Sequence, residues 1–371
     1  MSLFGKKTPP SLKRNFDNKR RYHFLGPVGE GGISYVSSFF DTRLNRVVAL
    51  KELRENQQYN DELQQFFINE AKLIGYLDHP GIIPIFDAFL HRDGGACYTM
   101  KLYEGKLLTE LLKEGANTDQ RHMPLARSFE IFLKLCETMA YVHDKGVLHL
   151  DLKPDNIMIG TYGEVMVMDW GSAYLYDSTR FYEYLEQHTE KTGLAHFAKE
   201  GEGIILGTPQ YMSPEQTTCS RDTLTCASDI FSAGTVFYEM LTGAHPFPSH
   251  DPDELKSRIR THNPPPPHEV NSDLPRRLSQ LCMKMLRKDV DERHGSFHTV
   301  LDDLAECRIA GETLPVEHYE AGQVIFNEGD TGDYSFMILS GEVEISKSID
   351  GARKVLARLG PGEVVGELAI I

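Results

Sequence analysis

The sequence predicts an α+β protein in which a β-rich segment and a mainly helical segment are followed by a smaller all-β unit. Residues 22–105 alternate short β-branched and aromatic runs with glycines, around one helical stretch at 61–77. Residues 106–307 show mostly helical periodicity, interrupted by a hairpin pattern near 157–169. After residue 308 short strands alternate with Gly and Asp turns, which is typical of an all-β unit.

Length and composition exclude several classes of protein. At about 150 residues per domain, 371 residues suffice for two or three domains. A net charge of −15 argues against a protein that binds nucleic acid through a broad basic face. No apolar run approaches the ~18–20 residues that span a membrane. The six cysteines have no CxxC spacing, which predicts reduced thiols in a cytoplasmic protein rather than a zinc site or a disulfide framework.

Residues 1–21 form a separate basic segment. They hold seven lysines and arginines against one aspartate, with two prolines and few apolar residues. This composition predicts a disordered, solvated arm, and contact with an acidic partner is the alternative.

A glycine cluster lies at 28–36, with the sequence VGEGGISYV between two strand-like runs. Glycines have no Cβ atom, so backbone amides in such a loop can approach phosphate oxygens closely. A plain β-hairpin turn is the alternative. There is no GxxxxGK[ST] pattern, which excludes a Walker-type loop.

Downstream, a lysine and a glutamate fall on apolar faces. Strand alternation places Val47, Ala49 and Lys51 on one face of the run VVALK. Glu70 lies on the apolar stripe of the predicted helix 61–77. A carboxylate on a buried face is costly unless it is paired, so we expect Glu70 to pair with Lys51. The alternative is a glutamate at the helix edge that reaches solvent.

The run HLDLKPDN at 149–156 places charged residues between apolar segments. It leads into two short strands that end in Asp169-Trp-Gly171. Carboxylates in loops and at strand ends are suited to metal or proton chemistry. Asp151, Lys153, Asn156 and Asp169 are therefore the candidate chemical residues.

With these motifs in this order, residues 22–307 resemble the Hanks-type (eukaryotic-like) serine/threonine protein kinases, especially their bacterial members. The glycine cluster resembles the Gly-rich loop, VALK the third-strand lysine motif, HLDLKPDN the catalytic loop, DWG the DFG motif and GTPQYMSPE the end of the activation segment. The resemblance implies a two-lobed kinase fold with an N-lobe at about 22–102 and a C-lobe at about 103–307.

The resemblance also implies transfer of phosphate from ATP to Ser/Thr hydroxyls of proteins. Asp151 would accept the hydroxyl proton and Lys153 would steady the γ-phosphate. Asn156 and Asp169 would bind Mg2+, with Mn2+ as an alternative. The residues that would bind ATP are Val28, Gly29, Glu30, Gly31, Gly32, Ser34, Val36, Ala49, Lys51, Glu70, the gatekeeper Met100 and the hinge residue Leu102.

Three residues would have structural roles. Glu215 and Arg293 would form an ion pair, and Asp229 would brace the catalytic loop. The chain departs from the family pattern at Ser34, where a glycine is usual, and at Trp170, where a phenylalanine is usual. It also departs at Leu150, where an arginine is usual. Because that arginine normally binds an activation-segment phosphate, we expect activity that does not depend on such a phosphate.

Residues 308–371 resemble part of the cyclic-nucleotide-binding β-roll. Gly366 and Glu367 would begin its phosphate cassette, with the glutamate on the ribose hydroxyl. The arginine that neutralises the cyclic phosphate would follow, but the sequence ends at Ile371. This argues against cyclic-nucleotide binding by the tail and predicts a longer natural chain.

The expected function is therefore that of an ATP-dependent protein kinase in signalling, regulated by its C-terminal module. Its partners would be ATP and protein substrates, with no nucleic acid and no membrane span, and its oligomeric state is left open. Two alternatives remain. One is a pseudokinase or scaffold, given the three departures. The other is a cyclic-nucleotide receptor without kinase activity.

Overall fold

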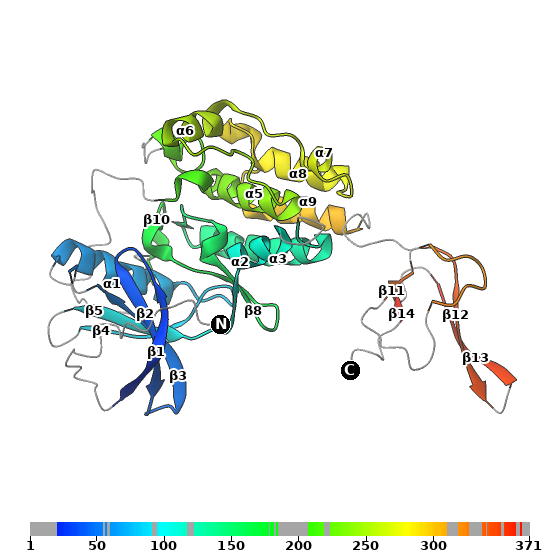
Figure 1. Cartoon of the computed structure of the whole chain (residues 1–371), viewed down its shortest axis with the longest axis horizontal. Helices are drawn as coiled ribbons and strands as arrows, with labels where there is room; N and C mark the ends of the chain where they lie inside the picture. Colours follow the sequence, from blue (N-terminus) through cyan, green and yellow to red (C-terminus); the bar gives the residue numbers. More distant parts are fainter. Residues whose placement is uncertain are drawn as a thin grey trace. The chain divides into compact units, whose positions relative to one another are not determined.

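The chain forms two compact units, Met1–Leu314 and Pro315–Ile371 (Figure 1). The fold is given by a computed structural model, and each unit is considered by itself. The residues that it describes are 21–54, 56–57, 60–90, 95–116, 122–177, 179–181, 183–184, 207–218, 223–309, 318–325, 336–338, 340–349, 352–360 and 364–365.

The first unit begins with a five-stranded antiparallel sheet in the order β1-β2-β3-β5-β4. Two apolar clusters fill its two faces, one around Phe39, Val48 and Leu50 and one around Leu53 and Phe67. The strands are β1 (Tyr22–Glu30), β2 (Ser34–Asp41), β3 (Arg46–Leu53), β4 (Ile85–Leu90) and β5 (Ala96–Lys101).

Helix α1 (Asp61–Tyr76) packs on this sheet against β4 and β5 (Figure 1). Its N-terminus is capped by Asn60, whose side chain accepts hydrogen bonds from the backbone N–H of Glu62 and Leu63 at 3.0 and 3.1 Å. An Asn cap and acidic residues in the first turn both stabilise a helix start. The helix predicted at 61–77 is thus confirmed to within one residue.

Arg21 is the first residue that the structure describes, and it is tied to the sheet. Its guanidinium donates to both carboxylate oxygens of Asp41, at 2.9 and 3.0 Å, and to Asp87 at 3.3 Å. The sequence composition predicts that Arg21 belongs to a solvated arm. That assignment was wrong for this residue, because the buried carboxylate of Asp41 requires a cation. The rest of the predicted arm, 1–20, lies outside the described residues.

A helical lobe follows the sheet. In Figure 1 the helices α3, α5, α8 and α9 lie alongside one another, and each contacts at least one other member of the group. Nearly every residue of α5 is buried, which makes it the central helix of this lobe. The helices are α2 (Leu108–Ala116), α3 (Leu125–Asp144), α5 (Cys226–Thr242), α6 (Pro252–Thr261), α7 (Pro267–Val270), α8 (Arg276–Met285) and α9 (Phe297–Ile309).

Two small sheets hold the ends of the loops that follow the five-stranded sheet and the first helices of the helical lobe. Strand β6 (Gly105–Leu107) pairs with β8 (Ile157–Gly160), which pairs with β9 (Val165–Val167). Strand β7 (Val147–Leu148) pairs with β10 (Tyr174–Leu175). Residues 149–156 therefore connect two anchored strands, and Asp169 follows the end of β9. Short 3-10 turns lie at Pro154–Asn156, Trp170–Ser172, Pro209–Tyr211, Gln216–Thr218 and Val290–Glu292.

The second unit is all-β in its described part, which confirms the predicted α+β organisation. Strand β12 (Val343–Ile349) forms a hairpin with β13 (Ala352–Leu359), and β11 (Phe336–Met337) pairs with β14 (Val364–Val365). Gly366 and Glu367 lie outside the described residues. In the described part of the chain, no helix has the length and apolar character to cross a membrane.

Candidate active site

Lys51 and Glu70 form an ion pair between β3 and α1. The ammonium Nζ lies 2.7 and 3.0 Å from the two carboxylate oxygens, and the Glu70 side chain is almost completely buried. Burial alone would lower the pKa of Lys51, but Glu70, Tyr98 and Asp169 outweigh it, so the pKa of Lys51 is raised. Lys51 is therefore a cation that Glu70 holds in one position.

The Gly-rich turn between β1 and β2 is short and open. The backbone N–H of Gly31 donates to the carbonyl of Ser34 at 2.9 Å, and Ser34 itself is buried at the start of β2. A Cβ atom placed on Gly29 or Gly32 would meet nothing within 4 Å. The space beside these two backbones is thus free for a ligand.

Arg54 holds this turn through its side chain, a contact that no sequence pattern indicated. Its Nη2 and Nε atoms donate to the carbonyl of Gly31 at 2.7 and 3.1 Å. Its guanidinium also lies 4.7 Å from the ring centroid of Tyr35. A guanidinium presents its donors in a fixed fork, so Arg54 limits how far the turn can move.

Strand pairing places three of the other predicted ATP-binding residues, Val36, Ala49 and Met100, on adjacent strands near Lys51. Val36 pairs with Lys51, and Ala49 pairs with Met100, in adjacent strands. Ala49 is buried, whereas Met100 is half-buried. The remaining predicted residues are Val28 and Glu30, exposed at the end of β1, and Leu102, half-buried just after β5.

Asp151 accepts three hydrogen bonds in the loop after β7. Its Oδ2 atom accepts from Nζ of Lys153 at 2.7 Å and from Nδ2 of Asn156 at 3.1 Å, and its Oδ1 atom accepts from the backbone N–H of Thr208 at 2.7 Å. Lys153 also donates to the Thr208 hydroxyl at 2.5 Å. The carboxylate is thereby oriented by groups from both the catalytic loop and the segment before η4 (Pro209–Tyr211).

Asn156 and Asp169 present oxygen atoms suited to a hard cation. The side-chain amide of Asn156 donates through Nδ2 to the backbone carbonyl and to Oδ2 of Asp151. The amide oxygen therefore points the other way. Asp169 has a left-handed backbone with φ of 59°. Mg2+ typically binds one or two such side chains together with substrate phosphates, so this pair of ligands fits it.

Asp229 at the start of α5 supports the catalytic loop from beneath. Its carboxylate accepts hydrogen bonds at 2.8 Å from the backbone N–H of His149 and of Leu150, and a third from Nε2 of His143. Burial alone would raise the pKa of Asp229, but these donors hold the pKa below its usual value. Leu150 has φ of 62°, an uncommon backbone that these bonds stabilise.

Leu150, where the family usually has arginine, belongs to an apolar cluster. It packs with Leu148 and Leu224, and Tyr174 and Cys226 cover the group. Gln216 also donates to the Leu150 carbonyl at 2.9 Å, a bond that no sequence pattern indicated. The chain just after the activation segment is thus attached to the catalytic loop by apolar packing and a neutral hydrogen bond, in addition to the Thr208 contacts with Asp151 and Lys153.

Trp170, the chain's single tryptophan, is almost fully buried. Its indole N–H donates to the carbonyl of Val167 at 3.3 Å, and its ring lies edge-on to His149 at 4.6 Å. A buried indole that has a hydrogen-bond partner packs without an unsatisfied donor.

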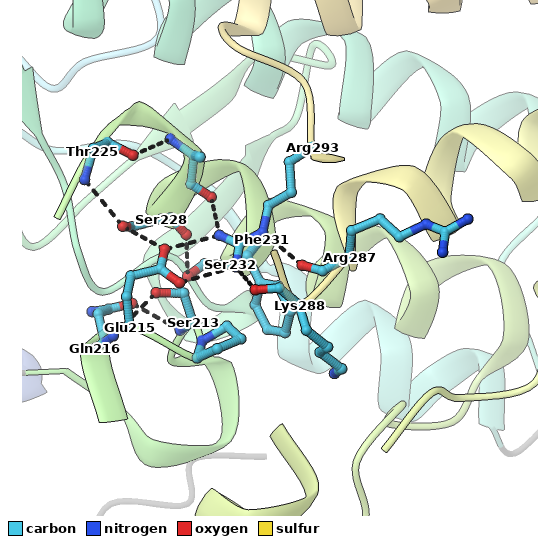
Figure 2. Close-up of polar contacts among 12 residues, drawn as sticks. Ser213, Glu215, Gln216, Thr225, Ser228, Phe231, Ser232, Arg287, Lys288 and Arg293 are labelled. Atoms are coloured by element: carbon cyan, nitrogen blue, oxygen red, sulfur yellow. Dashed lines mark hydrogen bonds and ion pairs between the residues drawn. The ribbon is translucent and has the colours of Figure 1, made fainter. Parts of the chain in front are cut away.

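Glu215 and Arg293 form a buried ion pair behind the site, shown in Figure 2. The two guanidinium nitrogens Nη1 and Nη2 lie 2.8 and 2.9 Å from the two carboxylate oxygens. The remaining guanidinium donors bind the backbone carbonyls of Ala227, Arg287 and Lys288. All five N–H groups are satisfied, which is the condition under which such a pair is tolerated in a core.

Comparison with known proteins agrees with this geometry. Residues 22–304 match the family model described as protein kinase domain, so the chain belongs to the protein kinase family. Residues 316–371 match the model described as cyclic nucleotide-binding domain.

Several relatives are bacterial proteins named serine/threonine-protein kinase PknD. The protein from Chlamydia felis is 35% identical over 298 residues, which cover 77% of this chain and 31% of that protein. The protein from Chlamydia trachomatis serovar D is 36% identical over 296 residues, covering 75% and 30%. The one from Protochlamydia amoebophila is 28% identical over 368 residues, covering 94% and 36%. The chain spans about a third of the length of these relatives.

Proposed function

We propose that the chain transfers the γ-phosphoryl group of ATP to serine and threonine hydroxyls of protein substrates. The observation that carries the proposal is the Asp151 carboxylate, which Lys153, Asn156 and Thr208 hold in one orientation. In phosphoryl transfer, catalysis consists mainly of positioning and of electrostatic stabilisation. A fixed carboxylate, two fixed cations and a glycine turn supply both.

In this mechanism Lys51, held by Glu70, contacts the α and β phosphates. The backbone amides of the turn at Gly29–Gly32 cover the phosphates. Asp151 orients the substrate hydroxyl and accepts its proton, while Lys153 stabilises charge on the transferred group. Asn156 and Asp169 would hold Mg2+, which neutralises negative charge on the phosphate oxygens when it is bound.

The substitution Asp151→Asn tests this role. It keeps the size of the side chain but removes the base, so phosphate transfer from ATP to a generic basic protein should fall by at least about 100-fold. Asp155→Asn is the matched control, because Asp155 is exposed in the same loop. Equal activity of the Asp151→Asn variant and the wild type would favour a different function, such as a scaffold.

Trp170 gives an independent test of nucleotide binding. Because it is buried next to Asp169, Mg-ATP should change its fluorescence. The same titration of the Asp169→Asn variant should show a weaker response. A wild-type signal that stays flat at saturating Mg-ATP contradicts the proposed site.

We propose further that the module matched at 316–371 regulates this activity in signalling. Calorimetric titration with cyclic AMP and cyclic GMP, each repeated with the kinase assay, separates a ligand-dependent module from one that acts without either nucleotide. We also propose that the substrates are proteins with Ser or Thr residues and that the chain acts in the cytoplasm, because its cysteines have no disulfide or zinc spacing.

A further inference from the structure

Cys226 is the first residue of α5 and lines a cavity of about 420 Å³. Its Sγ atom lies 3.6 Å from the hydroxyl oxygen of Tyr176, in a solvent-exposed contact. That hydroxyl in turn donates to the backbone carbonyl of His143 at 2.8 Å. The thiol is therefore placed between the activation segment, the end of α3 and an opening to solvent.

A cationic histidine lies behind this thiol. His143 is 5% exposed, and its Nε2 atom lies 2.8 Å from the Asp229 carboxylate. Among the described residues, its Nδ1 atom has no partner that meets the distance and angle of a hydrogen bond. The thiol of Cys226 is the polar group beside this side of the ring. Burial opposes a charged ring, but Asp229 and Cys226 outweigh it and raise the pKa of His143 to about 9.

The N-terminus of α5 is a second feature that stabilises negative charge on the Cys226 sulfur. A helix N-terminus stabilises negative charge in its first turn, and Cys226 occupies that turn after the Thr225 cap. Burial would raise the pKa of Cys226, but the His143 ring outweighs it, so the pKa of this thiol is lowered. A cationic histidine together with a helix N-terminus is the environment that makes a cysteine reactive.

The other cysteines in the described part of the chain lack this environment. Cys97, Cys136, Cys282 and Cys307 are buried, and burial raises the pKa of Cys136 and of Cys282. Cys219 lies outside the described residues. Reactivity at Cys226 is therefore a property of its position in the fold.

We propose that Cys226 is an oxidation site at which hydroperoxides modify the protein reversibly. The thiolate attacks the distal oxygen of the hydroperoxide, an S–O bond forms and the O–O bond breaks. Sulfur loses two electrons and becomes a sulfenic acid. The leaving group is an alkoxide, which takes a proton from water to give an alcohol, or hydroxide when the oxidant is hydrogen peroxide. A dithiol then reduces the sulfenic acid back to the thiol.

Oxidation at this position should inhibit phosphate transfer. The added oxygen enlarges a side chain that packs against the apolar cluster containing Leu150 and lies beside His143, whereas replacement of the cysteine by alanine adds no bulk there. His143 is the side-chain partner of Asp229, which holds the backbone of the catalytic loop. This consequence rests on the proposed kinase function, whereas the reactivity of the thiol does not.

The chemistry is tested on the full chain by timed alkylation with iodoacetamide at pH 7 and peptide mass spectrometry. The reference thiol is the one introduced by Ser257→Cys, at an exposed position of α6. Cys226 should react at least about fivefold faster than this reference, and His143→Gln should remove the difference. A Cys226 rate at or below the reference rate overturns the proposal, whether or not His143→Gln folds.

The regulatory part is tested with hydrogen peroxide, a dimedone trap for sulfenic acid, and the kinase assay. The wild type should carry dimedone on Cys226 and lose most of its activity, and dithiothreitol should restore that activity when the trap is omitted. Cys226→Ala should keep its activity in peroxide, and Cys219→Ser should behave as the wild type. Dimedone found only at another cysteine, or equal inhibition of Cys226→Ala, overturns the proposal. An untreated protein without activity would instead contradict the proposed function, and the alkylation rates would still decide this inference.

Discussion

The ring of His143 and the carboxylate of Asp229, 86 residues apart in the chain, meet at 2.8 Å beneath the catalytic loop. Both side chains are buried. The contact raises the pKa of the histidine and lowers that of the aspartate, so each group supports the charge of the other. The position of His149 and Leu150 depends on this pair, because the same carboxylate binds their backbone N–H groups.

Stability should therefore fall as the pH rises through the pKa of His143. The folded-state pKa of about 9 lies above the ordinary value of 6.5. The stabilisation is fully present below pH 6.5 and is lost as the pH passes about 9, a change on the order of 2–3 kcal/mol. Urea unfolding followed by Trp170 fluorescence at pH 6 and pH 9.5 measures it. His143→Gln should lose less stability than the wild type over this range. The same comparison is repeated with Cys226→Ala present in both proteins, which removes the neighbouring thiol. If the two proteins then lost the same stability between pH 6 and pH 9.5, the pH dependence would not come from His143.

The Lys51–Glu70 pair should be needed for catalysis more than for folding. Glu70→Gln keeps the side-chain shape but loses a charge-assisted hydrogen bond, so kcat/KM should fall about 10- to 100-fold. Glu62→Gln is the control on the same helix, because Glu62 is exposed. Steady-state kinetics with variable ATP distinguishes the two, and equal kinetics for both variants would count against the assigned contact.

Activity should survive removal of phosphate from the activation segment. Leu150, at the position where the family usually has arginine, packs against Leu148 and Leu224 and offers no cation for a phosphate. Phosphatase treatment, verified by mass spectrometry, should leave the kinase rate unchanged. A treated protein that is inactive and recovers on rephosphorylation would show that the apolar cluster is not sufficient.

Lys288 should destabilise the fold at neutral pH. Its ammonium has no hydrogen-bond partner among the described residues and lies 4.1 Å from the ring centroid of Phe247. Burial and the charge of Arg293 lower the pKa of Lys288 to about 8. Because the folded state disfavours the cation, the charge of Lys288 lowers the free energy of unfolding below pH 8. This effect fades as the pH rises toward 10.5, the ordinary pKa of lysine.

Lys288→Met should consequently raise the free energy of unfolding by about 1 kcal/mol at pH 6, after allowance for partial exposure. The gain should shrink by pH 10. Lys284→Met on α8 is the control, because Lys284 is exposed and pairs with Asp303. Chemical denaturation of the three proteins at both pH values provides the test, and a loss of stability at pH 6 would show that the cation–π contact dominates.

Local patterns were sufficient to predict the elements and many contacts of the site. Helical periodicity placed Glu70 on a buried face, and strand alternation placed Lys51 on another, so their pairing followed from the cost of burying a lone charge. The loop from His149 to Asn156 was identified in the same way, because its charged residues interrupt apolar strands. These inferences need only a few neighbouring residues and the rule that buried charges are paired.

The tertiary structure alone decided the contacts that join distant segments. Nothing near Arg54 in the sequence indicates that it holds Gly31, and nothing near Gln216 indicates that it binds the carbonyl of Leu150. The clearest case is Cys226, which in the sequence is one of six cysteines without a motif. Its environment arises because the end of α3 brings His143 to the first turn of α5. A pKa depends on the charges around a group in space, and those charges are assembled only when the helices pack.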